Sequence, residues 1–182
     1  MPIYSRAGDT QFDTPFVPCP AGVYSAVCVD VVDDGMKMST FKNKDGSDKM
    51  VHKISLVWQV PKLMDSGKRY SIRQWFTNSL FSGQGKKSNL RACLDSWGIH
   101  LSAEQNLGIE EFDLEDLLGM PCLLNVIHAK SQDGSKTYAN VGSIMPLPDG
   151  MVRLEPESYV RKTASTEALP SHITDPDFDV PF

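Results

Sequence analysis

The chain of 182 residues has no long apolar run and no closely spaced cysteines. No stretch approaches the roughly 20 apolar residues of a membrane-spanning helix, and the first eight residues hold no apolar signal core. The four cysteines are scattered without a CxxC pair, which excludes the dense pattern of a disulfide scaffold. We therefore expect a cytoplasmic protein with reduced thiols and no membrane partner.

Patterns of catalysis and metal binding are missing as well. The four histidines, at positions 52, 100, 128 and 172, show no metal-ligand spacing. No nucleophile can be paired with a general base. We expect no cofactor, no metal and no enzymatic activity.

Charge is distributed unevenly along a chain whose net charge is only −5. Residues 37–91 hold twelve basic and three acidic side chains, a net charge of +9, whereas residues 1–36 and 92–182 are acidic. A cationic window in an acidic protein indicates an anionic partner or, in the plainer alternative, a solvated charged face.

Apolar periodicity predicts five strands and a helical insertion. Residues 22–146 give strand, strand, strand, helix, strand, strand, which is the element order of the OB-fold, a five-stranded Greek-key barrel. We expect a loose arm over 1–21 and, because prolines and polar residues dominate there, a flexible acidic tail over 147–182. The predicted strands are 22–32 with a continuation through 36–41, then 51–60, 69–77, 122–130 and 136–145, and the main helix runs from Ser88 to Gly98.

Alternation along the second and third strands predicts which side chains face outward. Trp58 belongs to the apolar set that fills the core, whereas Trp75 lies on the opposite face with arginines. An exposed ring beside cations suits single-stranded nucleic acid, because bases stack on the ring while the cations follow the phosphates. The candidate single-stranded DNA-binding residues are Lys37, Phe41, Lys42, Lys44, Lys49, Lys53, Arg69, Arg73, Trp75, Lys86, Lys87, Arg91, Lys130, Lys136 and Tyr138.

The final eight residues alternate acids with other side chains and close on Val-Pro-Phe. This resembles the acidic tip of bacterial single-stranded DNA-binding proteins, from which Pro176 and Phe178 depart. The helical insertion, with the stretch from Ser88 to Trp97, looks more like bacteriophage OB-fold single-strand binders. The resemblance implies a tip that recruits other proteins through Asp175, Asp177, Phe178, Asp179, Val180, Pro181 and Phe182.

These observations favour a sequence-tolerant single-stranded DNA-binding protein of DNA replication and recombination, encoded by a phage and acting in the bacterial host cytoplasm. It protects single strands and recruits replication, recombination or repair partners, and it can form homo-oligomers. Two alternatives stay open: an OB-fold adaptor that binds protein, and a module that binds RNA or oligosaccharide.

Overall fold

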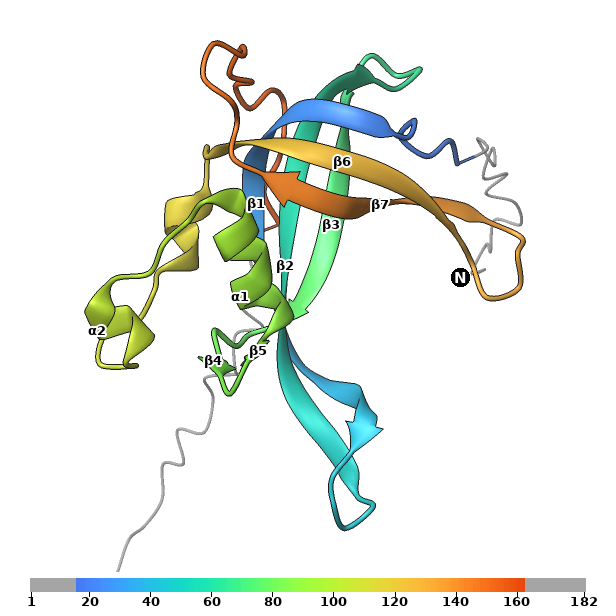
Figure 1. The fold of residues 1–182 in the computed structure, drawn as a ribbon. Coiled ribbons are helices and arrows are strands. Elements are labelled where there is room, and N and C mark those ends of the chain that lie inside the picture. The colour runs from blue at the N-terminus through green and yellow to red at the C-terminus, as the bar shows by residue number, and fades with distance from the viewer. Residues whose placement is uncertain (1–15, 163–182) are drawn as a thin grey trace, which may run out of the picture.

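The computed structural model describes residues 16–162, which form a mainly β structure (Figure 1). The three long strands predicted before the helix and the two after it are all present, and the first two are longer than the pattern indicated. The strands of the main sheet are β1 (Gly22–Lys42), β2 (Asp48–Leu63), β3 (Arg69–Thr77), β6 (Pro121–Lys130) and β7 (Thr137–Met145). A small hairpin, β4 (Ser82–Gly83) with β5 (Lys86–Lys87), precedes the helical segment.

The main sheet has the order β3-β2-β1-β6-β7, and every neighbouring pair is antiparallel. The two edge strands, β3 and β7, therefore run parallel to each other. The sheet curls enough to bring these edges close together, although they are not hydrogen-bonded neighbours in the described sheet. The curled sheet thus has an inner face that holds the core and an outer face.

Helix α1 (Asn89–Trp97) closes one end of this core. The Ser88 hydroxyl accepts a hydrogen bond from the Arg91 backbone N–H, and Gly98 ends the helix in the left-handed conformation, both as predicted. The apolar side of α1 packs inward, where Trp97 meets Trp58 of β2 edge to face, with ring centroids 5.9 Å apart. Both indoles are buried, so the core assignment of Trp58 is confirmed.

Two short helices follow α1. Helix α2 (Ala103–Asn106) begins with a capping box of Ser102 and Gln105, and the 3₁₀ helix η1 (Leu114–Leu117) is capped by Asp113. Within residues 16–162 there is no helix with the length and hydropathy needed to cross a membrane.

Two hairpins project from the body of the molecule. β1 and β2 extend past the edge of the sheet as a two-stranded ribbon, and β6 and β7 form a second hairpin that points another way (Figure 1). β1 runs without interruption through residues 33–35, which separate the two predicted parts of this strand, because a bulge between Asp33 and Gly35 absorbs one residue without breaking the pairing with β2.

Residues 152–162, here called the strap, lie against the outer face of the sheet. The side chains of Leu154 and Tyr159 pack on a small apolar cluster of Val27, Val29 and Val57. These residues belong to the predicted flexible tail over 147–182, because prolines such as Pro156 and polar side chains interrupt any periodicity there. Polar contacts compensate for the small apolar area, for example the paired hydrogen bonds between the Gln59 side-chain amide and the Glu157 backbone, 2.7 and 2.9 Å long.

The strap is anchored on Asp30, a carboxylate that is 0% exposed in the middle of an apolar stretch of β1. Its oxygens accept hydrogen bonds from the Tyr159 hydroxyl at 3.1 Å, the Arg161 Nε at 3.0 Å and the Lys162 backbone N–H at 2.8 Å. A buried carboxylate is tolerated only when it is paired and hydrogen-bonded. The strap therefore supplies the hydrogen-bond donors and the cation that the buried Asp30 carboxylate requires.

We expect Arg161→Ala to lower the free energy of unfolding by about 1–3 kcal/mol, because a buried carboxylate loses its cationic partner but keeps two other donors. Arg153→Ala is the matched control. Arg153 also lies on the strap, but its side chain is exposed, donates to the Gly119 carbonyl and forms a 3.6 Å ion pair with exposed Glu155, so a loss below about 1 kcal/mol is expected. Urea titration followed by circular dichroism measures both. Equal losses in the two variants would contradict the anchoring role of Asp30.

Candidate nucleic-acid interface

The outer face of β3 carries an exposed aromatic ring, as the strand alternation predicted. Trp75 is 61% exposed, whereas its strand neighbour Phe76 is buried in the core. The Arg73 guanidinium lies over the indole at 5.8 Å from the ring centroid, a cation–π arrangement. This contact holds the ring in place and leaves part of its surface open to solvent.

Cations continue this face onto the neighbouring strands. Lys53 of β2 is paired with Thr77 of β3 and donates from Nζ to the Thr77 hydroxyl at 3.0 Å. Because side chains alternate, Lys49 lies on the same face of β2 as Lys53, and Lys37 of β1, which is paired with Val51, lies there too. The structure thus brings Lys37, Lys49, Lys53, Arg73 and Trp75 onto one continuous surface, here called the Trp75 face.

A cleft of about 940 Å³ borders the Trp75 face along the gap between β3 and β7. Tyr70, Arg73 and Trp75 line it from β3, and Lys130 and Tyr138 line it from the β6–β7 hairpin. Tyr138 also packs on Phe16, whose ring centroid is 6.1 Å away. The cleft therefore presents aromatic surfaces on two walls, with a cation beside each.

The tips of the two hairpins are built from the same Asp-Gly-Ser turn. In the first turn, the Asp45 carboxylate accepts hydrogen bonds from the backbone N–H and the hydroxyl of Ser47. In the second turn, the Asp133 carboxylate accepts hydrogen bonds from the backbone N–H and the hydroxyl of Ser135 and from the Ser131 hydroxyl. These hydrogen bonds lower the pKa of Asp45, and they lower that of Asp133 to about 2. Both turns are therefore held by their own carboxylates, and they set the positions of the neighbouring lysines and aromatic side chains.

Lysines and exposed aromatic residues flank these turns. Phe41, 77% exposed, with Lys42 and Lys44, lies at the β1–β2 tip, where Lys42 pairs with Asp48 at 3.3 Å. Lys136 lies at the β6–β7 tip.

The remaining cations of the predicted DNA-binding set lie away from the Trp75 face or are paired with acidic residues of this chain. Arg69 belongs to the strap contact, since it pairs with Glu157 at 2.5 Å and donates to the Glu155 carbonyl at 2.7 Å. The interpretation of Arg69 as a free outward cation therefore misses its role as a strap anchor, which depends on a contact 86 residues away in the sequence.

Lys87 and Arg91 share an acidic partner in the last turn of α1. Both pair with Asp95, at 2.6 and 3.0 Å, and the hydrogen bond from Lys87, followed by that from Arg91, lowers the pKa of this carboxyl. Arg91 also donates to the Asn106 side chain at 2.8 Å, so it ties α1 to α2. Lys86 is exposed on β5. These three side chains are not part of the Trp75 face.

The strap ends beside the Trp75 face. Burial raises the pKa of the Tyr159 hydroxyl, the Asp30 carboxylate raises it further, and nearby Arg73 lowers it. Arg73 is therefore close both to the ring of Trp75 and to Tyr159 of the strap. The sequence did not predict that the strap lies beside Arg73. The one indication of it was Asp30, a single charged residue within the apolar run Val-Cys-Val-Asp-Val-Val, because a buried carboxylate there requires a partner.

Other predicted site residues and ligands can be placed only in part. Asp175, Asp177, Phe178, Asp179, Val180, Pro181 and Phe182 lie outside the described residues. Among residues 16–162, no group of three histidine, cysteine or acidic side chains is arranged to hold a metal ion. The chain matches no protein-family model, and a search of curated proteins finds no match.

Iodide quenching of tryptophan fluorescence tests the geometry of this face. Of the three tryptophans, Trp58 and Trp97 are buried and Trp75 is exposed. We expect iodide to quench one component of the emission, and Trp75→Phe to remove that component while leaving the buried emission unchanged. A variant that is still quenched by iodide would show that another indole is exposed and that the strand register is different.

Proposed function

We propose that the protein binds single-stranded DNA on the Trp75 face, without sequence preference. Single-strand binders combine a cationic track for the phosphates with aromatic rings on which bases stack, and every base offers such a surface. The observation that carries the proposal is the pairing of exposed Trp75 with Arg73 on a strand flanked by two hairpins that carry lysines.

The fold we propose for this function is an OB-fold. The strand order, the parallel directions of β3 and β7, and the helix between β3 and β6 support it. In that fold the second and third strands form the binding surface, and the loops after the first and fourth strands flank it. The corresponding parts here are β2, β3 and the tips of the two hairpins. We propose that a protein that binds single-stranded DNA in this way acts in DNA replication and recombination.

A fluorescence titration with oligo-dT tests the proposal directly, because the exposed indole is the one that a bound base contacts. We expect Trp75→Ala to weaken binding by about 1–3 kcal/mol. Arg73→Ala should weaken binding and reduce the salt slope by under one unit, since a single strand contributes about 0.7 per phosphate contact.

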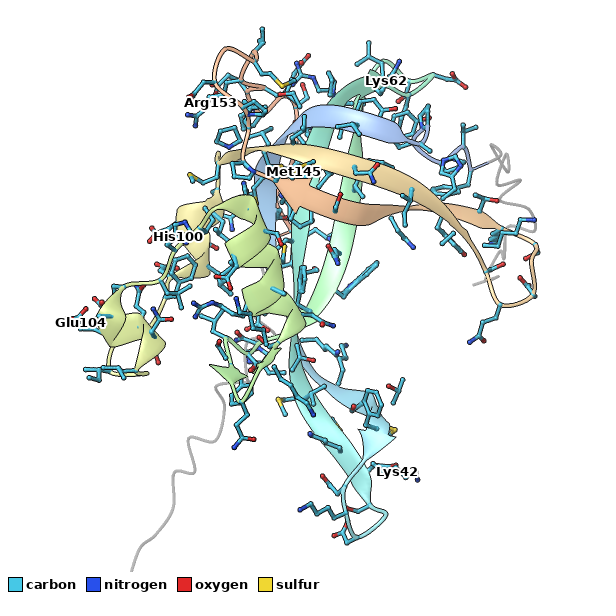
Figure 2. The ribbon with its side chains drawn as sticks, in the orientation of Figure 1. Lys42, Lys62, His100, Glu104, Met145 and Arg153 are labelled. Carbon is cyan, nitrogen blue, oxygen red and sulfur yellow. The ribbon has the colours of Figure 1, made fainter. Side chains whose placement is uncertain are left out.

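Arg153→Ala is the control cation, since Arg153 lies away from the Trp75 face at the base of the strap (Figure 2). It should leave both affinity and salt slope unchanged. Binding that does not depend on salt, or that Trp75→Ala leaves intact, would contradict the proposal. Preference for oligo-U or for duplex DNA would instead favour an RNA-binding or duplex-binding function.

We also propose that residues 175–182 recruit other replication or recombination proteins. The acidic groups with a following aromatic residue suit a basic-rimmed apolar pocket on a partner. Phe182→Ala should abolish the capture of replication proteins from a host extract and leave oligo-dT affinity within about twofold. Asp175→Asn is the matched control, and it should weaken capture only partly. Capture of the same proteins by Phe182→Ala and by the unaltered chain would rule out this role.

A further inference from the structure

The outer face of the sheet continues past Trp75 toward the start of β3. Alternation along β3 places Arg69 and Ser71 on the same side of the strand as Trp75. Ser71 also lines the cleft, together with Arg73 and Trp75, so the open surface reaches Ser71. Gln59 of β2 is paired with Ser71 and lies on the same face, but it is only 3% exposed, because the strap covers it.

Residues 155–158 are the part of the strap that covers this region. All four residues are exposed, and they lie between Leu154 and Tyr159, which pack on the apolar cluster of the outer face. Ser158 has a φ of +51°, a left-handed conformation that is unfavourable for a residue with a Cβ atom. The segment is therefore fixed at its two ends, while its own backbone is strained and its own side chains bury no apolar surface.

The hydrogen bonds and ion pairs of this segment to the sheet run to two side chains. The Gln59 amide donates to the Glu157 carbonyl at 2.7 Å and accepts from the Glu157 N–H at 2.9 Å. The Arg69 guanidinium pairs with the Glu157 carboxylate and donates to the Glu155 carbonyl at 2.7 Å. Glu157 is thus the residue through which the segment is held.

The groups that Glu157 offers are those that a nucleotide offers. A guanidinium binds phosphate as well as carboxylate, so a phosphate can take the place of the Glu157 carboxylate on Arg69. The backbone N–H and C=O of Glu157 give Gln59 a donor and an acceptor, and the Watson–Crick edge of each base also carries a donor beside an acceptor. The side-chain amide of Gln59 can turn to match either order, which suits binding without sequence preference.

We propose that Gln59, Arg69 and Ser71 form a further nucleotide subsite, which Glu157 fills in the free protein. The subsite rests on the function proposed above and extends its surface along β3. A single strand that passes Trp75 displaces the covering segment and takes over its contacts: a phosphate pairs with Arg69, a base edge meets the Gln59 amide, and the exposed Ser71 hydroxyl lies beside both.

The ion pair between Arg69 and Glu157 is open to exchange. The Glu157 side chain is 58% exposed, and ion pairs at a protein surface contribute little to stability. The strained backbone at Ser158 relaxes once the segment moves away. Asp30 keeps its donors from residues 159–162, so the strap stays attached to the sheet while the segment swings outward.

Amide hydrogen exchange of the full chain, resolved by NMR, tests the displacement. The N–H groups of Glu157 and Lys162 both lie on the strap, and they are bonded to Gln59 and Asp30 respectively. With oligo-dT long enough that affinity no longer rises with length, we expect the Glu157 amide to exchange about tenfold faster or more. The Lys162 amide should keep its protection. Ligand contacts usually slow exchange, so acceleration at Glu157 alone is specific to displacement.

The same measurement can overturn the subsite. If the Glu157 amide exchanges at an unchanged or slower rate with oligo-dT of every length, the strap stays closed on bound DNA and marks the end of the track. Equal acceleration at Glu157 and Lys162 would also contradict the proposal, because the whole strap would then leave the sheet.

Glu157→Gln removes the competing carboxylate and retains the shape of the side chain. We expect this variant to bind the long oligo-dT about two- to fivefold more tightly, the gain that release of a surface ion pair allows. Glu155→Gln is the matched control. Glu155 contacts Arg69 only through its backbone carbonyl, so a gain below about twofold is expected at 0.15 M salt, where exposed charges are screened. Equal gains in the two variants would reflect a general change of charge and would count against the subsite.

Tryptophan fluorescence in the same samples separates the subsite from the proposed function. Binding of oligo-dT that depends on Trp75, without faster exchange at Glu157, refutes the subsite and leaves the function standing. Absence of any binding to oligo-dT refutes the function, and the subsite falls with it.

Discussion

The buried Asp30 carboxylate is the interaction on which the arrangement of the outer face depends. A charge in the middle of an apolar strand is stable only with donors around it, and the strap brings three of them from residues 159–162. In doing so it covers Val57 and Gln59 of β2 and engages Arg69 of β3. The outer face is thereby divided into a covered part and an open part.

The open part is where the proposed function lies. Arg73 lies where the two parts meet, close both to the indole of Trp75 and to Tyr159 of the strap. The hairpins extend the cationic surface beyond the body of the sheet, and their Asp-Gly-Ser turns are stabilised by hydrogen bonds within each tip. A rigid ring beside flexible lysines suits a ligand with flat bases and a charged backbone.

Much of the sheet follows from local sequence patterns. Alternation placed Trp58 inside and Trp75 outside, and the caps at Ser88 and Gly98 fixed the ends of α1. These features depend on neighbours within a few residues. The predicted second strand ends at residue 60, yet β2 continues through Pro61 to Leu63, because a register irregularity after Gln59 accommodates a residue without an N–H.

The strap could not be predicted in the same way. Its residues have no periodicity and little apolar surface, and its contacts span about a hundred residues of sequence, as between Gln59 and Glu157. For the same reason, the sequence placed Arg69 among the DNA-binding cations, whereas the structure pairs it with Glu157 of the strap. A cluster of cationic residues in a sequence indicates an anionic partner, but only the fold shows which of these residues are exposed and not already paired with acidic residues of the chain.

Photo-cross-linking of a single strand that carries 5-iodouracil, followed by peptide mapping, tests the location of the binding surface most directly. The account predicts cross-links at Trp75 on β3 and at Tyr138 on the β6–β7 hairpin, the two aromatic walls of the cleft. Cross-links confined to helix α2 or to the strap, with none at Trp75, would contradict it.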